Sequence, residues 1–223
     1  MYYQLSSTEQ NYIKQIYTLS DGNHQNVLTS DLAAAIKIKA ATATDMLSRL
    51  SEKKLVDYEK YYGARLTDKG KQVALNIIRK HRLWEVFLSE KLGFSWDEVH
   101  EMAEELEHAT SDELSNRLEH FLGNPKTDPH GDPIPNRKGE IEKLKTVRLS
   151  EAVQNSIVEI RSVEDQNPAL LKFLSKHRLT PGARLLIKDI NQFDNSLEVK
   201  VNNKKVLQIS RDVAENLWII RVK

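Results

Sequence analysis

The chain contains no cysteine, which excludes disulfide bonds, zinc sites built on thiolates and catalysis by a thiol. It also lacks an apolar run long enough to span a membrane, and its first residues do not have the pattern of a secretory signal. We therefore expect a cytoplasmic protein. Its 223 residues, 39% hydrophobic and 29% charged, fit one large globular domain or two to three small ones.

The net charge of +1 conceals a strong asymmetry along the chain. Residues 1–80 carry a net charge of +4, residues 81–123 carry −8 and residues 124–223 carry +5. A basic block suits contacts with phosphate groups, whereas an acidic block suits a cation. The first two blocks therefore predict different kinds of ligand.

The first block has the pattern of a winged helix-turn-helix. Apolar spacing predicts helices over 7–19, with Ser7 or Thr8 as N-cap, over 30–36, with Thr29 or Ser30 as N-cap, and over 41–53. Two β-like runs then flank a Tyr-Gly turn and predict a hairpin wing. A short helix, a tight turn and a longer helix with polar residues at its start form a DNA-binding motif. The residues expected to contact DNA lie on the third helix and the wing: Lys39, Thr42, Thr44, Asp45, Ser48, Arg49, Lys60 and Arg65.

The acidic block predicts a metal site on a helix over 96–109. His100, Glu104, Glu107 and His108 share one face at 3.6 residues per turn, and imidazoles with carboxylates suit a first-row divalent metal. His81 and Glu85, one turn apart on a predicted helix over 69–92, could complete a second set of ligands. A third amphipathic helix is predicted over 112–122. Three such helices without an evident hydrophobic partner suggest self-association.

The third block divides into a connecting segment and a β-rich region. Residues 123–150 are rich in glycine, proline and aspartate, which predicts a linker in which His130 belongs to a turn. Alternating apolar runs then predict a small β-barrel with one helix over 168–176. The predicted strands cover 156–160, 183–187, 196–201, 205–209 and 217–222.

Taken together, these motifs resemble the diphtheria toxin repressor and manganese transport regulator family of bacterial metal-dependent transcriptional repressors. The resemblance is carried by Arg79-Lys80-His81-Arg82-Leu83 with Glu85, by Val99-His100, by Glu107-His108 with Ser111-Asp112-Glu113, by the wing, and by Pro129-His130-Gly131-Asp132-Pro133-Ile134-Pro135. It implies a mainly α fold with α+β parts. The implied domains are a winged helix over 1–72, a helical dimerisation and metal-binding domain over 73–123, a linker over 124–150 and an SH3-like small β-barrel over 151–223.

The resemblance also implies two metal sites in each subunit. One uses Asn11, Glu104, Glu107 and His108, and the other uses His81, Glu85 and His100. The SH3-like domain can lend a further ligand to the second site, for which Glu164, Asp165 and Gln166 are the candidates by position.

Two features bear on which metal these sites take. Glu104 stands where iron-responsive members have cysteine, which favours Mn²⁺, whereas His100 follows the iron-responsive pattern. Asn11 and Lys14 stand where the manganese branch has Asp and Glu, and a lysine there would repel a metal ion. The sequence thus predicts Mn²⁺ or Fe²⁺, with Zn²⁺ possible in vitro, and argues against two closely spaced ions.

The expected function is a homodimeric repressor, activated by metal, that binds palindromic operators and controls metal-uptake genes. A metal ion would tie the first helix, through Asn11, to the helix that carries Glu104 and His108. No membrane and no small-molecule substrate are implied, and we expect no enzymatic activity. Two alternatives remain open: a metallohydrolase with Glu101 or Glu105 as its base, and a DNA-binding protein that needs no metal.

Overall fold

The computed structural model describes residues 5–142, 145–164 and 167–222. The chain forms two compact units. The first unit contains Met1–His81, Leu106–Thr110 and Pro135–Ile141, and the second contains Arg82–Glu105, Ser111–Ile134 and Glu142–Lys223. Among the described residues, no helix combines the length and the apolar character needed to cross a membrane.

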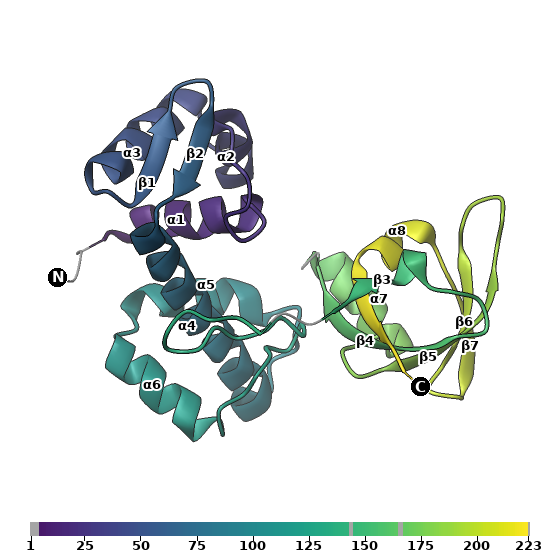
Figure 1. Cartoon of the computed structure of the whole chain (residues 1–223). Coiled ribbons are helices and arrows are strands. Elements are labelled where there is room, and N and C mark those ends of the chain that lie inside the picture. The colour runs from purple at the N-terminus through teal and green to yellow at the C-terminus, as the bar shows by residue number, and fades with distance from the viewer. Residues whose placement is uncertain (1–4, 143–144, 165–166, 223) are drawn as a thin grey trace. The chain divides into compact units, whose positions relative to one another are not determined.

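The first unit is built around a winged helix-turn-helix. Its elements are α1 (Ser7–Leu19), α2 (Thr29–Ile36), α3 (Ala40–Glu52) and the antiparallel hairpin of β1 (Val56–Glu59) and β2 (Gly63–Leu66) (Figure 1). One apolar face of each helix enters a common core, in which Ile13, Ile16, Leu32, Leu47 and Leu50 are fully buried. The predicted order of helices and wing is therefore confirmed.

The predicted N-caps of the first two helices were wrong. Ser6 caps α1: its hydroxyl accepts from the amide of Glu9, and the Glu9 carboxylate accepts in return from the amide of Ser6. This reciprocal capping box satisfies two amide groups that the helix itself leaves unpaired. Helix α2 begins at Thr29 after Leu28, whose side chain makes no capping bond.

A glycine allows the wing to pack closely against the helices. Gly63 has a φ of +98°, and a Cβ atom there would lie 2.4 Å from the carbonyl oxygen of Val27. The neighbouring Ala64 exchanges two backbone hydrogen bonds with Val27, of 2.9 and 2.8 Å. Only glycine fits this approach, which fixes the base of the wing.

Three helices follow, and the two units share the first two of them. Helix α4 (Asp68–Leu92) is continuous across the boundary between His81 and Arg82, and α5 (Val99–Ala109) is continuous across the boundary between Glu105 and Leu106. Helix α6 (Asp112–Phe121) begins after Ser111, whose hydroxyl accepts from the amide of Leu114. The sequence predicted all three helices to within a few residues.

The second unit contains a six-stranded antiparallel sheet in the order β3-β8-β4-β5-β6-β7 (Figure 1). Apolar residues that alternate along the strands form its core together with α7 and α8, as the predicted SH3-like domain requires. The bounds are β3 (Val147–Arg148), a 3₁₀ turn (Leu149–Glu151), β4 (Ile157–Val163), α7 (Pro168–His177), β5 (Arg184–Ile190), β6 (Leu197–Val201), β7 (Lys205–Ile209), α8 (Arg211–Glu215) and β8 (Leu217–Arg221).

Two segments of the second unit join this core to α4 and α5. Trp96, between α4 and α5, belongs to the hydrophobic core of the sheet and donates from Nε1 to Ser175 Oγ at 2.6 Å. The His130 ring stacks on the Trp96 ring at 5.6 Å between centroids, and the His130 carbonyl accepts from the amide of Val163. A Cβ atom on Gly131 would lie only 1.8 Å from the carbonyl oxygen of Arg161, so glycine is required here.

Candidate metal centres and DNA-binding surface

The Glu85 carboxylate, fully buried on α4, lies between two clusters of metal-binding side chains. In one cluster, potential ligand atoms of His81, Glu85 and His100 all lie within 4.8 Å of one another, and in the other the same holds for Glu85, Asp128 and His130. His81 and Glu85 are one turn apart on a single helix. The structure thus brings together the three residues that the sequence placed in the second ligand set.

Each oxygen of Glu85 faces a different histidine. His100 Nδ1 lies 3.5 Å from Glu85 Oε1, and His130 Nδ1 lies 3.7 Å from Glu85 Oε2. His81 is positioned from its other side, because its Nδ1 lies 2.6 Å from Glu107 Oε2. Pairing of one imidazole nitrogen with a carboxylate is the usual support for a histidine whose second nitrogen binds a metal.

The second cluster includes two candidate ligands, Asp128 and His130, that the sequence did not indicate. His130 lies in a turn, as expected, but its ring is buried, and its Nε2 lies 2.8 Å from the carbonyl oxygen of Trp96. Asp128 Oδ1 accepts from the amides of His130 and Asp132 at 2.8 and 3.0 Å, whereas Asp128 Oδ2 makes no hydrogen bond and lies 3.4 Å from Arg82 Nε. The sequence feature that could have indicated them is an aspartate and a histidine two residues apart, followed directly by Gly131.

The charges in this cluster are poorly compensated. Burial, together with the neighbouring carboxylates of Asp132 and Glu85, raises the pKa of Asp128 from 3.8 to about 7. Burial alone would lower the pKa of His130, but the Glu85 and Asp128 carboxylates outweigh it and raise this pKa. Buried carboxylates that repel one another provide a favourable environment for a cation.

The residues of the first predicted ligand set are arranged differently. Glu107 is buried on α5, and both of its oxygens accept from Lys14 Nζ of α1, at 2.7 and 3.0 Å. His108 Nε2 lies 3.7 Å from Glu107 Oε1, and His108 Nδ1 lies 2.9 Å from Gln10 Oε1.

The other two members of that set, Glu104 and Asn11, have different surroundings. Glu104, whose side chain is 41% exposed, lies 3.9 Å from His100 Nε2. Asn11 Oδ1 is buried without a hydrogen bond. Within the described part of the chain, no group of three histidine or acidic ligands forms around Glu107. The metal role of Asn11, Glu104, Glu107 and His108 thus stays a prediction that this arrangement does not favour.

Glu164, the candidate ligand from the sheet domain, is paired with residues outside both clusters. The Glu164 carboxylate pairs with Arg148 and accepts from Trp218 Nε1 at 3.1 Å. The alternative candidates, Asp165 and Gln166, lie outside the described residues.

Most of the predicted DNA-contacting residues form an exposed polar face on α3 and the wing. Lys39 immediately precedes α3, and Thr42, Asp45, Ser48 and Arg49 are exposed along it, whereas Thr44 is partly buried. The hydroxyls of Thr44 and Ser48 donate to backbone carbonyls one turn earlier, which leaves their oxygens able to accept a further hydrogen bond.

The wing adds exposed cations and two exposed tyrosines, Tyr61 and Tyr62, that were not among the predicted DNA contacts. Lys60 and Arg65 are exposed, as predicted. Tyr61 is 84% exposed at the tip, and Lys60 Nζ lies 5.2 Å from its ring centroid. An exposed helix beside a protruding basic hairpin suits a major groove and the neighbouring phosphates.

Large apolar side chains are exposed on the helices of the second unit. Phe121 on α6 is 64% exposed, with its ring centroid 6.2 Å from that of Phe87 on α4. Leu114 on α6, Leu92 at the end of α4 and Met102 on α5 are also exposed. Exposed apolar side chains on amphipathic helices are typical of a surface that another chain covers.

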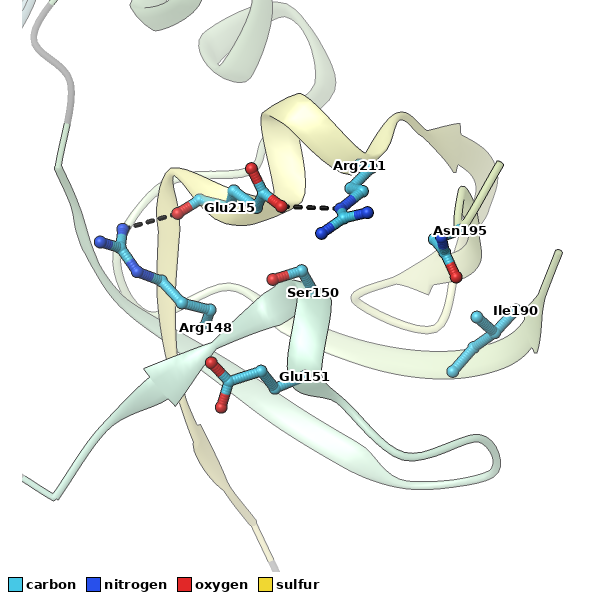
Figure 2. A pocket seen from close by; sticks show the side chains of 7 residues that line it. All are labelled: Arg148, Ser150, Glu151, Ile190, Asn195, Arg211 and Glu215. Carbon is cyan, nitrogen blue, oxygen red and sulfur yellow. Dashed lines mark hydrogen bonds and ion pairs between the residues drawn. The ribbon is translucent and has the colours of Figure 1, made fainter. Parts of the chain in front are cut away.

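The sheet domain contains a hollow of about 500 Å³, bordered by β3, the 3₁₀ turn and α8 (Figure 2). Its two arginines are already paired. Arg211 Nε lies 2.7 Å from Glu215 Oε1, while Arg148 donates to the Glu215 carbonyl and pairs with Glu164. None of the residues that line it belongs to a predicted metal or DNA site.

A winged helix followed by helices that carry buried carboxylate–histidine clusters defines a metal-dependent DNA-binding regulator. Three family profiles match successive parts of the chain: "Iron dependent repressor, N-terminal DNA binding domain" over residues 4–64, "Iron dependent repressor, metal binding and dimerisation domain" over 67–136 and "FeoA domain" over 147–221. The chain belongs to the iron-dependent repressor family, and it is a metal-dependent transcriptional repressor of the diphtheria toxin repressor type.

Individual relatives support this assignment. An uncharacterized HTH-type transcriptional regulator of Methanocaldococcus jannaschii is 36% identical over 118 residues, which are 53% of this chain and 94% of that protein. The iron-dependent repressor IdeR of Mycobacterium leprae is 31% identical over 163 residues, or 70% of each chain. A solved structure described as a manganese-dependent transcriptional repressor in complex with manganese is 33% identical, with a TM-score of 0.88, 96% of this chain covered and 100% of that one.

Proposed function

We propose that the protein is a homodimeric repressor that binds a divalent metal ion at the Glu85 carboxylate and, in that state, binds palindromic operator DNA. The observation that carries the proposal is the convergence of three buried side chains, Glu85, Asp128 and His130, next to His81 and His100. Buried carboxylates of this kind require a compensating positive charge.

The ligand types favour Mn²⁺ or Fe²⁺. The two clusters offer carboxylate oxygens and imidazole nitrogens, and the chain has no thiolate to select a softer ion. Relatives are described as manganese-dependent or iron-dependent repressors, and structures of ScaR contain Zn²⁺ or Cd²⁺. Because Zn²⁺ binds most nitrogen and oxygen sites more tightly than Mn²⁺, we expect it to bind in vitro as well.

When bound, the ion supplies the positive charge that the buried carboxylates need. Glu85 is placed to hold it, because its two oxygens face His100 and His130 from one rigid helix. Glu107 orients the His81 ring through Nδ1, and Asp128 is held in place by two backbone amides. Because these residues come from α4, α5 and the turn around His130, binding there restrains their relative positions.

We assign dimerisation to the exposed apolar side chains of Leu114 and Phe121 and their neighbours, and DNA binding to the exposed face of α3 and the wing. Two winged helices held at a fixed spacing match half-sites one helical turn apart on a palindrome. In line with the expectation from the sequence, we also propose that the protein acts in the cytoplasm as a regulator of metal-uptake genes, without enzymatic activity.

Operator binding measured at controlled metal concentrations tests the proposal. DNA duplexes are selected from a random-sequence library with Mn²⁺-loaded protein, and their affinity is then measured by fluorescence anisotropy in chelator and with Mn²⁺, Fe²⁺ or Zn²⁺. We expect metal to tighten binding about 5- to 150-fold, the usual range for a coupling between two sites. Glu85→Gln should lose this gain, whereas Glu101→Gln, a matched change at an exposed position of α5, should keep it.

Equal affinity with and without metal would favour the alternative of a regulator that needs no metal. Metal-dependent hydrolysis of generic esters would favour the alternative of a metalloenzyme, which needs an open coordination position and a positioned base.

A further inference from the structure

The Glu107 carboxylate is paired with the ammonium group of Lys14. Lys14 Nζ lies 2.7 Å from one Glu107 oxygen and 3.0 Å from the other, and His81 Nδ1 lies 2.6 Å from Oε2. The Lys14 side chain is only 14% exposed, and the Glu107 side chain is fully buried. The pair therefore joins α1 to α5 in surroundings where charges interact more strongly than in water.

A divalent ion at Glu107 would compete with Lys14 for the carboxylate and would be repelled by the charge of the Lys14 ammonium. Both carboxylate oxygens accept from the ammonium, so an ion at Glu107 would compete with Lys14 for them. The lysine would then remain beside the ion as a like charge, because α1 holds its backbone in place. Of the donors expected to help bind the ion, His108 pairs through Nδ1 with Gln10 and Glu104 lies 3.9 Å from His100 Nε2, whereas Asn11 Oδ1 makes no hydrogen bond.

We infer that Lys14 is the resident cation of the Glu107 carboxylate. It ties α1 to α5 in the metal-free protein, where the resemblance implied a metal ion through Asn11, and divalent ions bind at the Glu85 clusters alone. The inference rests on the proposed metal function of Glu85. Lys14 thereby acts as a positioning and selectivity residue: it sets how many ions each chain holds.

The number of bound ions per chain tests this inference. The full-length protein is dialysed to equilibrium against Mn²⁺, and the bound metal is counted by elemental analysis. We expect Lys14→Met to bind one more ion per chain than the wild type, because Glu107 loses its cation. Lys14→Arg, which keeps the charge, should match the wild type. If Lys14→Met binds no additional ion, the inference is overturned.

Two further variants complete the test. Lys53 pairs with Glu9 of α1 at 2.5 Å, so Lys53→Met removes a comparable ion pair from the same helix and should leave the count unchanged. His108→Ala in the wild-type background should also leave it unchanged. A loss of one ion in His108→Ala would place an ion at Glu107 and overturn the inference.

Glu85→Gln separates the two proposals. If this variant keeps every bound ion, the proposed function of Glu85 fails. If it loses its metal while His108→Ala also loses one ion, the proposed function stands and only the inference about Lys14 fails.

Discussion

Replacing Asp128 by asparagine should stabilise the metal-free protein at neutral and higher pH. The change removes a buried charge whose nearest compensation is Arg82, 3.4 Å from Asp128 Oδ2. It keeps the side-chain oxygen that accepts from the amides of His130 and Asp132, so the turn retains both of its hydrogen bonds. The perturbation is therefore close to a deletion of charge alone.

The magnitude follows from the pKa of Asp128, which rises from 3.8 to about 7 on folding. Between these two values the folded protein holds a proton that the unfolded chain has lost. The stability that this carboxyl group contributes at low pH is therefore lost as the pH rises through 7, by about 1.4 kcal/mol per pH unit. From pH 5 to pH 8 the wild type should lose on the order of 3 kcal/mol that Asp128→Asn does not lose.

Urea unfolding of both proteins in chelator measures this difference at pH 5 and pH 8. Tryptophan fluorescence is a suitable signal, because the Trp96 ring stacks on His130 in the same region. Asp212→Asn, at an exposed position of α8, makes the same chemical change without a buried charge and should show no such pH-dependent gain. A stability difference between Asp128→Asn and the wild type that is the same at both pH values would refute the reasoning.

Three further changes have definite expected outcomes. Gly131→Ala should lower the free energy of unfolding by about 2 kcal/mol or more in a urea titration, because its Cβ would lie 1.8 Å from the Arg161 carbonyl oxygen. Gly182 has a similar φ but no atom within 4 Å of such a Cβ, so Gly182→Ala should lower the free energy of unfolding by less. Equal losses in the two variants would show that the close contact at Gly131 does not matter. Arg49→Ala should weaken operator binding and reduce the slope of log affinity against log salt concentration by about one, while an unchanged slope would remove Arg49 from the phosphate contacts. Phe121→Asp should shift the protein toward monomer in sedimentation equilibrium, and a dimer of unchanged affinity would exclude Phe121, which is 64% exposed, from the interface.

Local patterns account for the parts of the fold that could be predicted from the sequence. The apolar spacing that buries Leu47 and Leu50 identified α3, and the alternation around Val199 and Val201 identified β6. These features depend on residues a few positions apart, so one sequence contains the information. The N-cap of α1 was misplaced by a residue because Ser6, Ser7 and Thr8 are all suitable caps, and only the hydrogen bonds distinguish them.

The candidate site could be predicted only where its ligands share a helix or a known motif. Lys14 and Glu107 are 93 residues apart, and nothing in either segment specifies that they meet. Asp128 and His130 lie in a segment whose composition indicates a linker. They reach Glu85 because Gly131 allows the chain to touch β4 and because Trp96 anchors the turn in the sheet domain. These are tertiary contacts, which composition and periodicity do not encode.

Anomalous X-ray scattering from crystals of the Mn²⁺-loaded protein tests the central claim most directly. The account predicts a manganese peak in direct contact with the Glu85 carboxylate and its histidines, and none between Lys14 and Glu107. A peak bound by Glu107 and His108, with the Glu85 carboxylate free of metal, would contradict it.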